Sequence, residues 1–404
     1  MRGTRLSTPE GLWPFTPNLS TAQGYTEDLS PTIPGFGRGA LWPSPSRLDV
    51  GLPTRLLSES IAGPLSGGGN GAPWGRSSDG SALGTPGGRG RDGGPGFNQP
   101  VKPGGYLWWY VDGISDCGQH GLTIIIFVGS VFSPYYHWSH QRALGQGSES
   151  NPEDFCSVNV ALYSPGKKRW TMTERGARSL TRTESHYQLG PSRAHWDGQA
   201  LVISIDEWNL YPIPRRVKGQ VRLEPEQLFS FQTALDSEGR HRWGPIAPRA
   251  RIHASFEDPN LRWSGHGYLD SNEGDEPIEG PFSSWDWCRA DLADGSVAVL
   301  YDIRPERGAD RLLALRFRPD GSITSFEPVA RTSLGSTAWR VPRSIRAHPH
   351  RTRTLEDTPF YARGMVEADL LGERVLAMHE TLNLPRLRSP VVKAMLPWRM
   401  PRLR

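Results

Sequence analysis

The sequence has little cysteine, little excess charge and no long hydrophobic run. The 404 residues include three cysteines, Cys117, Cys156 and Cys288, which lie far apart and form no Cys-x-x-Cys pair. This spacing argues against a disulfide framework or a zinc site of the usual kind, and it fits a reducing compartment. The net charge of +4 is small for this length. It predicts no nucleic-acid partner, because nucleic-acid binding usually needs a clustered basic face.

Targeting segments and common catalytic motifs are also missing. Arg2 and Arg5 are followed by no apolar stretch, so we expect no secretory signal peptide. The longest apolar run, residues 122–132, is too short to span a bilayer as a helix and is interrupted by Gly129 and Ser130. There is no Walker loop, Gly-x-Ser-x-Gly elbow, His-Glu-x-x-His motif or Rossmann fingerprint. Phosphoryl transfer, hydride transfer and zinc chemistry therefore lose support.

Glycine and proline, in contrast, are abundant, with 46 and 36 residues, and both break helices. Thirteen of the glycines fall within the 31 residues 66–96, where few side chains are apolar. Such a segment cannot bury enough apolar surface to offset the entropy lost on ordering. Residues 1–65 contain scattered apolar residues without a clear period. The sequence therefore predicts that residues 1–96 form a disordered extension, with a weakly ordered arm lying on the main body as the alternative for residues 1–65.

From Phe97 onward, short segments rich in aromatic and β-branched residues alternate with turn residues, which is typical of β-strands. Residues 106–112 and 122–132 are expected to pair as a hairpin. Further strands are expected at residues 157–164, 200–208, 219–223, 250–256, 263–270, 284–292, 296–303, 311–318, 323–328, 362–371 and 374–379. The best helix candidate is residues 225–235. Regularly spaced short strands predict an all-β sandwich or barrel, and two series of them predict two such domains.

The densest group of chemistry-bearing side chains lies in residues 263–270. Because side chains alternate between the two faces of a strand, His266, Tyr268 and Asp270 are expected to share one face, with Leu269 opposite. If that face is buried, burial raises the pKa of Asp270 and makes it a general acid at neutral pH. The alternative is that Asp270 begins a turn and is solvated, as aspartates at strand ends commonly are. From spacing alone this alternative is the stronger one.

Other aromatic clusters are candidates for substrate contacts, although core packing explains each of them too. His241 and Trp243 share one face of an extended segment. Trp285 and Trp287 are expected to place both indoles on one side. Residues 133–138, which include Tyr135 and Tyr136, could form a lid or rim, or simply an aromatic turn at a strand end.

The C-terminal segment, residues 384–404, is basic and carries Leu, Val, Met and Trp398 with no acidic residue. This composition is found in segments that lie on a membrane surface. Its prolines prevent one long amphipathic helix. A disordered basic tail is an equally good reading of the composition.

Several long stretches resemble the carotenoid 1,2-hydratases, or hydroxyneurosporene synthases, of purple bacteria. They are residues 97–136 (FNQPVKPGGYLWWYVDGISDCGQHGLTIIIFVGSVFSPYY), HRWGP, GHGYLDSNEGDEPIEGPFSSWDW and MHETLNL (378–384). The resemblance covers residues 97 to the mid-380s. It implies two lipocalin-like β-barrel or sandwich domains side by side, at residues 97–240 and 241–383. The basic tail then follows at 384–404.

The resemblance also implies an activity, namely the addition of water to the terminal C1–C2 double bond of acyclic carotenoids such as neurosporene and lycopene, without a cofactor or metal. The proposed acid–base residues of the family fall on His241, Trp243, Tyr268 and Asp270. Asp270 then protonates the alkene, and Trp243 and Tyr268 stabilise the carbocation through their π faces. His241 positions or deprotonates water, or returns the proton to Asp270. The resemblance thus reverses the preference for a solvated Asp270.

A C40 polyene needs a long apolar slot and access from a bilayer. We therefore expect His266, Tyr135, Tyr136, Trp285 and Trp287 to contact the substrate. We also expect a peripheral enzyme on the cytoplasmic side of the inner or intracytoplasmic membrane of a photosynthetic bacterium. Two alternatives remain. One is an isoprenoid cyclase or pericyclase on the same scaffold, and the other is a carrier that binds carotenoids or lipids without turnover.

Overall fold

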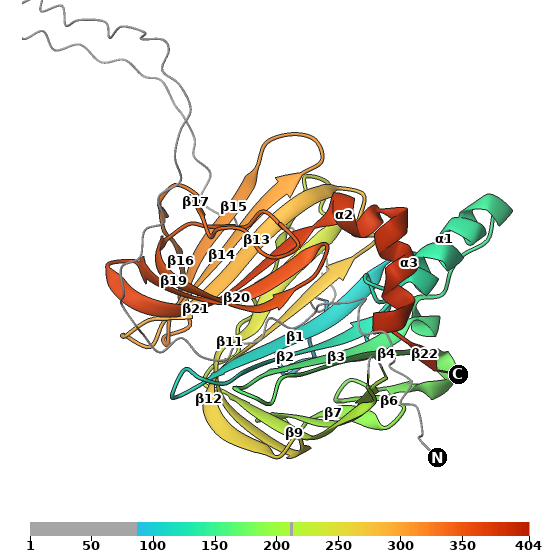
Figure 1. Ribbon diagram of the computed structural model, residues 1–404, viewed down its shortest axis with the longest axis horizontal. Helices are drawn as coiled ribbons and strands as arrows, with labels where there is room; N and C mark the ends of the chain where they lie inside the picture. The colour runs from blue at the N-terminus through green and yellow to red at the C-terminus, as the bar shows by residue number, and fades with distance from the viewer. Residues whose placement is uncertain (1–86, 211–212, 404) are drawn as a thin grey trace, which may run out of the picture. The chain divides into compact units, whose positions relative to one another are not determined.

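Two large β-sheets, antiparallel except for the β22–β4 pair, account for most of the fold in the computed structural model, which describes residues 87–210 and 213–403 (Figure 1). The first sheet has the strand order β22-β4-β3-β2-β1-β12-β11-β9-β8-β7-β6-β5, with β10 paired to β11. The second has the order β16-β15-β14-β13-β21-β20-β19, and β17 and β18 form a separate hairpin. The sequence-based prediction of an all-β protein built from two β units is confirmed.

The elements have the following bounds. The first sheet contains β1 (Tyr106–Ser115), β2 (Gly121–Val128), β3 (Cys156–Tyr163), β4 (Arg169–Arg175), β5 (Leu180–Arg182), β6 (His186–Leu189), β7 (Ser192–Trp196), β8 (Leu201–Asn209), β9 (Arg215–Pro225), β10 (Thr233–Ala234), β11 (His241–Asp258), β12 (Leu261–Gly274) and β22 (Arg402–Leu403). The second contains β13 (Phe282–Asp291), β14 (Val297–Pro305), β15 (Arg311–Phe317), β16 (Ile323–Ser325), β19 (His348–Asp357), β20 (Tyr361–Leu370) and β21 (Glu373–Asn383). The hairpin is β17 (Thr332–Ser333) with β18 (Ser344–Ile345), and the helices are α1 (Pro134–Gln146), α2 (Leu384–Arg388) and α3 (Pro390–Arg399), with short 3₁₀ turns at Pro152–Asp154 and Ala177–Ser179.

Alternation along the central strands separates two hydrophobic cores. On β1, Leu107 and Trp109 point into a core enclosed by the first sheet, together with Leu269 of β12. Trp108 and Tyr110 point the other way, into an aromatic core shared with the second sheet. Because strand side chains have a period of two, one strand can serve both cores. The face that carries the candidate acid is thus the one between the two sheets.

The chain passes from the first sheet to the second between Gly274 and Phe282. Strands β11 and β12, which follow the predicted boundary at 240/241, pair with β9 and β1 and so lie in the first sheet. The domain limits at 97–240 and 241–383 stay predictions. The chain leaves the first sheet for the second only after Gly274, which is later than the predicted boundary.

Residues 133–138, expected to be a rim or an aromatic turn, instead begin helix α1. The Ser133 hydroxyl accepts a hydrogen bond from the Tyr136 amide, Pro134 occupies the first helical turn, and Gly147 ends the helix in the left-handed region (φ 63°). The predicted helix at 225–235 was wrong, because this stretch is an irregular segment ending in the short strand β10. None of the helices in the described part of the chain has the length and apolar character needed to cross a membrane.

The C-terminal segment is ordered, so the reading of a disordered tail was wrong for residues 384–403. Its short helices α2 and α3 each begin with a proline in the first turn, and β22 then pairs with β4. Leu384, Leu387 and Met400 are buried in the core between the sheets. Burial of these apolar side chains holds the segment on the protein.

Most of the predicted disordered extension, residues 1–86, lies outside the described residues. Its last part, residues 87–96, is packed against the first sheet, and there the prediction was wrong. The Arg89 side chain is 2% exposed and donates hydrogen bonds to the carbonyl oxygens of Phe229, Phe231 and Pro245 at 2.6–2.7 Å. These hydrogen bonds fix residues 87–96 on the first sheet, although the glycine-rich composition of the segment predicts disorder.

Candidate active site

Asp270 lies on β12 with its carboxyl group in the aromatic core between the sheets, not in a solvated turn. Its Oδ2 accepts hydrogen bonds from Trp243 Nε1 at 2.7 Å and from Tyr268 Oη at 2.8 Å. Tyr268 precedes it by two residues on the same face, and Trp243 lies on β11, directly across from Asn272. The alternating strand pattern and the pairing of β11 with β12 together assemble this triad.

The environment keeps the Asp270 carboxyl group protonated at neutral pH. Burial raises its pKa from 3.8 to about 8. The hydrogen bonds from Trp243 and Tyr268 oppose this shift, while the nearby charges of Glu380 and Asp112 add to it. Oδ1 has no hydrogen-bond partner among the residues that the structure describes. Since both donors bind Oδ2, Oδ1 is the oxygen that is free to carry a proton.

Aromatic rings surround this carboxyl group. The Trp287 ring lies 5.3 Å from Tyr268 and 5.4 Å from Tyr110, and the Tyr301 ring lies 5.4 Å from Trp243. Trp285 packs 5.8 Å from Tyr301, so both tryptophans of β13 face the same core, as predicted. Their negative π faces can stabilise a cation formed beside Asp270.

His241 shares the face of Trp243, but its polar contacts are with other groups. Its Nδ1 is 2.8 Å from Tyr106 Oη, and its Nε2 is 3.5 Å from Glu276 Oε1. Burial lowers its pKa, while the charges of Asp236 and Glu276 oppose the shift. The contacts tie His241 to the edge of the core near Phe282, where the two ring centres are 5.1 Å apart. Its catalytic role stays a prediction.

The remaining predicted contact residues lie in other surroundings. The His266 side chain is 40% exposed and lies 4.0 Å from Asp116. Tyr136 stacks on Phe155 and donates to a backbone carbonyl, which is a packing role for α1. Tyr135 lies near Trp138 on the same helix. The structure thus brings together Asp270, Trp243, Tyr268, Trp285 and Trp287. The contacts of His266, Tyr135 and Tyr136 are with residues outside this cluster.

Two buried ion pairs lie beside the acid, and the sequence predicts neither pairing, although it offers Tyr110 and Asp112 as candidates at an ordinary strand end. Glu380 accepts hydrogen bonds from Tyr110 Oη at 2.5 Å and from Arg363 Nε at 2.7 Å. Asp112 pairs with Arg289, and both side chains are fully buried. The signal for Glu380 was present in the motif at residues 378–384, whereas nothing local indicates which charged residues of distant strands will meet.

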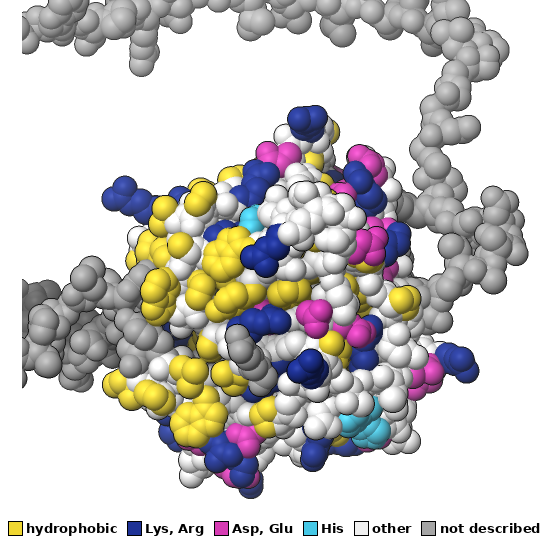
Figure 2. All heavy atoms as spheres, turned by 90° about the vertical axis from the view of Figure 1, so that its right-hand side faces the viewer, with side chains coloured by type: hydrophobic (Ala, Val, Ile, Leu, Met, Phe, Trp, Pro, Cys, Tyr) yellow, Lys and Arg dark blue, Asp and Glu magenta, His cyan; other side chains and the backbone are white. Residues whose placement is uncertain are grey.

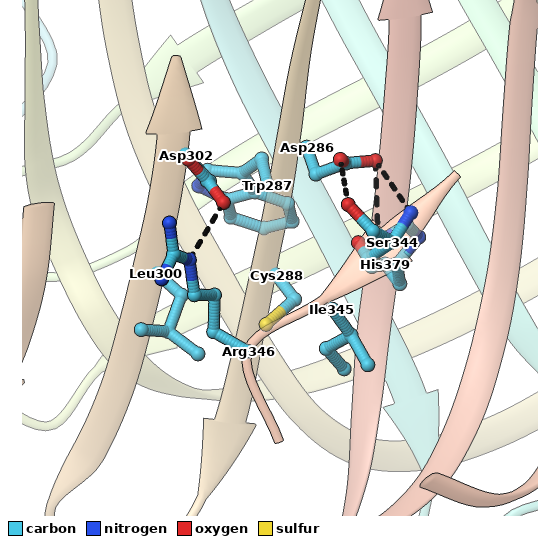
Figure 3. A pocket seen from close by; sticks show the side chains of 9 residues that line it. All are labelled: Asp286, Trp287, Cys288, Leu300, Asp302, Ser344, Ile345, Arg346 and His379. Atoms are coloured by element: carbon cyan, nitrogen blue, oxygen red, sulfur yellow. Dashed lines mark hydrogen bonds and ion pairs between the residues drawn. The ribbon is translucent and has the colours of Figure 1, made fainter. Parts of the chain in front are cut away.

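A small cavity lies between the second sheet and β18, lined by Asp286, Cys288 and Ile345 among others (Figure 3). It holds about 10 Å³, which is room for at most one water molecule. Asp286 accepts hydrogen bonds from Ser344, Arg304 and Thr381, and Arg346 pairs with Asp302. Because these groups satisfy one another, their contacts hold β18 against the second sheet.

The described residues contain no group of three or more His, Cys, Asp or Glu side chains arranged to hold a metal ion.

Comparison with known proteins identifies relatives of this chain. A family model described as carotenoid hydratase CrtC matches residues 124–404. An acyclic carotenoid 1,2-hydratase of Rubrivivax gelatinosus is 54% identical over 383 residues, covering 94% of this chain and 93% of that protein. One of Thiocapsa roseopersicina is 46% identical and covers both chains fully (100%). A solved structure, a putative AttH from Nitrosomonas europaea, aligns with a TM-score of 0.48 and 17% identity, covering 69% of this chain and 92% of that one.

Proposed function

We propose that this chain, which belongs to the carotenoid hydratase CrtC family, is an acyclic carotenoid 1,2-hydratase. The reaction adds water across the terminal C1–C2 double bond of an acyclic carotenoid and leaves a tertiary alcohol. The observation that carries the chemistry is the buried Asp270 carboxyl group, whose pKa is raised to about 8 and whose Oδ1 is unpartnered among the described residues beside an aromatic core.

Asp270 donates its proton to C2, which leaves the positive charge on the tertiary C1. A pKa of about 8 keeps the proton in place at neutral pH but makes Asp270 a weak acid. The hydrogen bonds from Trp243 and Tyr268 to Oδ2 compensate, because they strengthen as the carboxylate forms in the transition state. The indole and phenol rings then stabilise the carbocation.

The core between the sheets supplies the apolar surroundings that a polyene needs. It extends from Trp243 and Tyr268 to Leu384 and Leu387 of α2 and Val392 of α3. The helices thus cover one end of the same core that contains the acid. A polyene that enters beside α2 and α3 reaches Asp270 without leaving apolar surroundings.

The outer surface of α1 and α3 supports a peripheral membrane location. Trp138 and Leu144 of α1 and Val391 and Trp398 of α3 are 42–69% exposed. Figure 2 views the molecule from the side on which α1 and α3 lie, and hydrophobic side chains gather there beside Lys and Arg. Neither helix contains an acidic residue. Exposed aromatic and aliphatic side chains with basic neighbours suit an anionic membrane surface.

The substrate is itself a bilayer solute, so docking by this face would present α2 and α3 to the store of substrate. All three cysteines are unpaired, which fits the cytoplasmic side of the membrane.

The test is incubation of the purified protein with lycopene in water labelled with oxygen-18. The expected product is a 1-hydroxy carotenoid carrying the label. A cyclised product without added oxygen would instead indicate a cyclase on this scaffold, and bound lycopene without turnover would indicate a carrier.

A further inference from the structure

The motif at residues 378–384 contains a carboxylate that the proposed reaction has not yet used. On β21, His379 and Thr381 face Asp286 on the far side of the second sheet. Glu380 lies between them and faces the opposite way, into the core between the sheets. It is directly across from Trp287 of β13 and Arg363 of β20.

Glu380 is held by two strong contacts. Its Oε1 accepts a hydrogen bond from Tyr110 Oη at 2.5 Å and another from Arg363 Nε at 2.7 Å. The Arg363 side chain is 1% exposed and also contacts Tyr163 and Glu356, so it stays charged and fixed. The charge-assisted hydrogen bond from this guanidinium orients the Glu380 carboxylate.

Tyr110 connects this carboxylate to the acid. On the first sheet it lies directly across from Asp270. Its ring is 6.2 Å from that of Tyr268, whose hydroxyl binds Asp270, and 5.4 Å from that of Trp287. The negative charge of Glu380 contributes to the raised pKa of Asp270, which places the two carboxyl groups within electrostatic reach.

Hydration needs a proton acceptor as well as a donor. Water that attacks the C1 cation must lose a proton, and His241 lies at the edge of the core, with Nδ1 bound to Tyr106 and Nε2 3.5 Å from Glu276. Resting on the proposed function, we propose that Tyr110 and Glu380 form the proton-accepting side of the site. The attacking water passes its proton to Tyr110 Oη while Tyr110 passes its own to Glu380 Oε1.

The step balances without an additional reactant. The C1–O bond forms, one O–H bond of water breaks, and the proton ends on Glu380, while Asp270 is left as a carboxylate. Transfer of a proton from Glu380 back to Asp270, through Tyr110 or solvent, restores both groups. Nothing is oxidised or reduced.

The experiment compares lycopene hydration by the wild type, Glu380→Gln and Tyr110→Phe across a pH series. Because a positioned base contributes about 10²-fold to 10⁴-fold, we expect kcat of both variants to fall at least about 100-fold with little change in KM. In Glu380→Gln, loss of the negative charge is expected to move the alkaline limb of the pH profile, which reports Asp270, to lower pH. Infrared titration of the Asp270 carboxyl group measures the same shift without turnover.

The charge of Glu380 acts on several titratable groups of the elements packed around it, and its removal is felt by all of them: Tyr110 and Asp112 (β1), Asp270 (β12), Tyr301 (β14), Tyr361 and Arg363 (β20), and His379 (β21). The matched control is Glu356→Gln, which removes a carboxylate that lies 3.4 Å from the same Arg363 nitrogen that binds Tyr163. It is expected to keep wild-type kcat and an unmoved alkaline limb.

Full kcat in Glu380→Gln, or an equal loss in Glu356→Gln, would overturn the inference while leaving wild-type hydration intact. If the wild type itself forms no hydrated product, the proposed function fails first. An unmoved infrared titration in Glu380→Gln would separately refute the coupling between the two carboxyl groups.

Discussion

The indole nitrogen of Trp243 donates a hydrogen bond to Asp270 Oδ2 across two neighbouring strands, at a distance of 2.7 Å. The bond crosses the β11–β12 pair diagonally, because Trp243 is opposite Asn272 and Asp270 is opposite Pro245. It leaves Oδ1 free to carry a proton. The chemistry of the site therefore depends on the register of two long strands.

Replacing the acid should abolish hydration without unfolding the protein. In Asp270→Asn the amide oxygen can still accept from Trp243 and Tyr268, but no transferable proton remains. We expect kcat to fall by at least about 10³-fold, within the range of general-acid contributions. Product analysis with circular dichroism of the variant checks this. A folded variant with substantial turnover would remove Asp270 from the role of acid.

The wild-type rate should depend on pH through the protonated form of Asp270. Its pKa of about 8 means that the acid is lost as the pH rises through that value. Above it, kcat/KM is expected to fall about tenfold per pH unit. A profile that stays flat well above this pH would contradict the assignment.

Removal of either hydrogen-bond donor to Asp270 should weaken catalysis. It should also move the alkaline limb of the pH profile to higher pH, whereas Glu380→Gln moves it to lower pH. The bonds from Trp243 and Tyr268 lower the pKa of Asp270, so their loss in Trp243→Phe or Tyr268→Phe raises it further. We expect kcat to fall about 10-fold to 100-fold, the value of a hydrogen bond to a charged group. Steady-state rates across the pH series provide the measurement, and a limb that moves to lower pH would be the contrary result.

The Asp270 carboxyl group should make the wild-type protein less stable to unfolding than the Asp270→Asn variant at alkaline pH. Its pKa is 3.8 unperturbed and about 8 when folded, so folding takes up a proton between these values. Wild-type stability therefore declines as the pH rises from the lower to the higher value, whereas the amide has no such dependence. We expect the variant to gain on the order of a few kcal/mol by about pH 9 and little near pH 4. Urea unfolding at both pH values is the test, and an equal difference at both would contradict it.

Truncation should show where the folded chain begins. A chain starting at Gly87 keeps the three hydrogen bonds of Arg89, whereas one starting at Arg91 leaves the carbonyls of Phe229, Phe231 and Pro245 without them. The shorter chain is expected to lose on the order of 3 kcal/mol of unfolding free energy or more. Equal denaturation midpoints for the two chains would show that Arg89 contributes little.

The proposed membrane face can be tested by vesicle flotation. Trp398→Ser and Val391→Ser, on the exposed side of α3, should reduce binding to anionic vesicles by removing apolar side chains that are 63% and 69% exposed. The matched control is Leu371→Ser, because Leu371 is 39% exposed at the turn between β20 and β21, the opposite end of β21 from α2. Equal flotation of all variants would argue against this face.

Local pattern was sufficient for the strands and for part of the site. Alternation placed Tyr268 opposite Leu269 and put Trp285 and Trp287 on one face, and the structure confirms both. It missed α1, although Ser133 and Pro134 are a recognisable helix start, because the aromatic residues that follow suggested a strand end. The glycine-rich residues 87–96 were assigned to disorder because composition does not reveal three distant carbonyls that bind Arg89.

The sequence by itself determined the all-β class, the face on which Asp270 lies and the family, because strand periodicity and long tryptophan-rich stretches are local properties. The resemblance favoured a buried Asp270, but only the tertiary structure decided which groups surround its carboxyl group, among them Glu380, 110 residues further along the chain. A pKa depends on desolvation and on charges within a few ångströms. Those neighbours come from strands of two sheets, whose order in space no local pattern specifies.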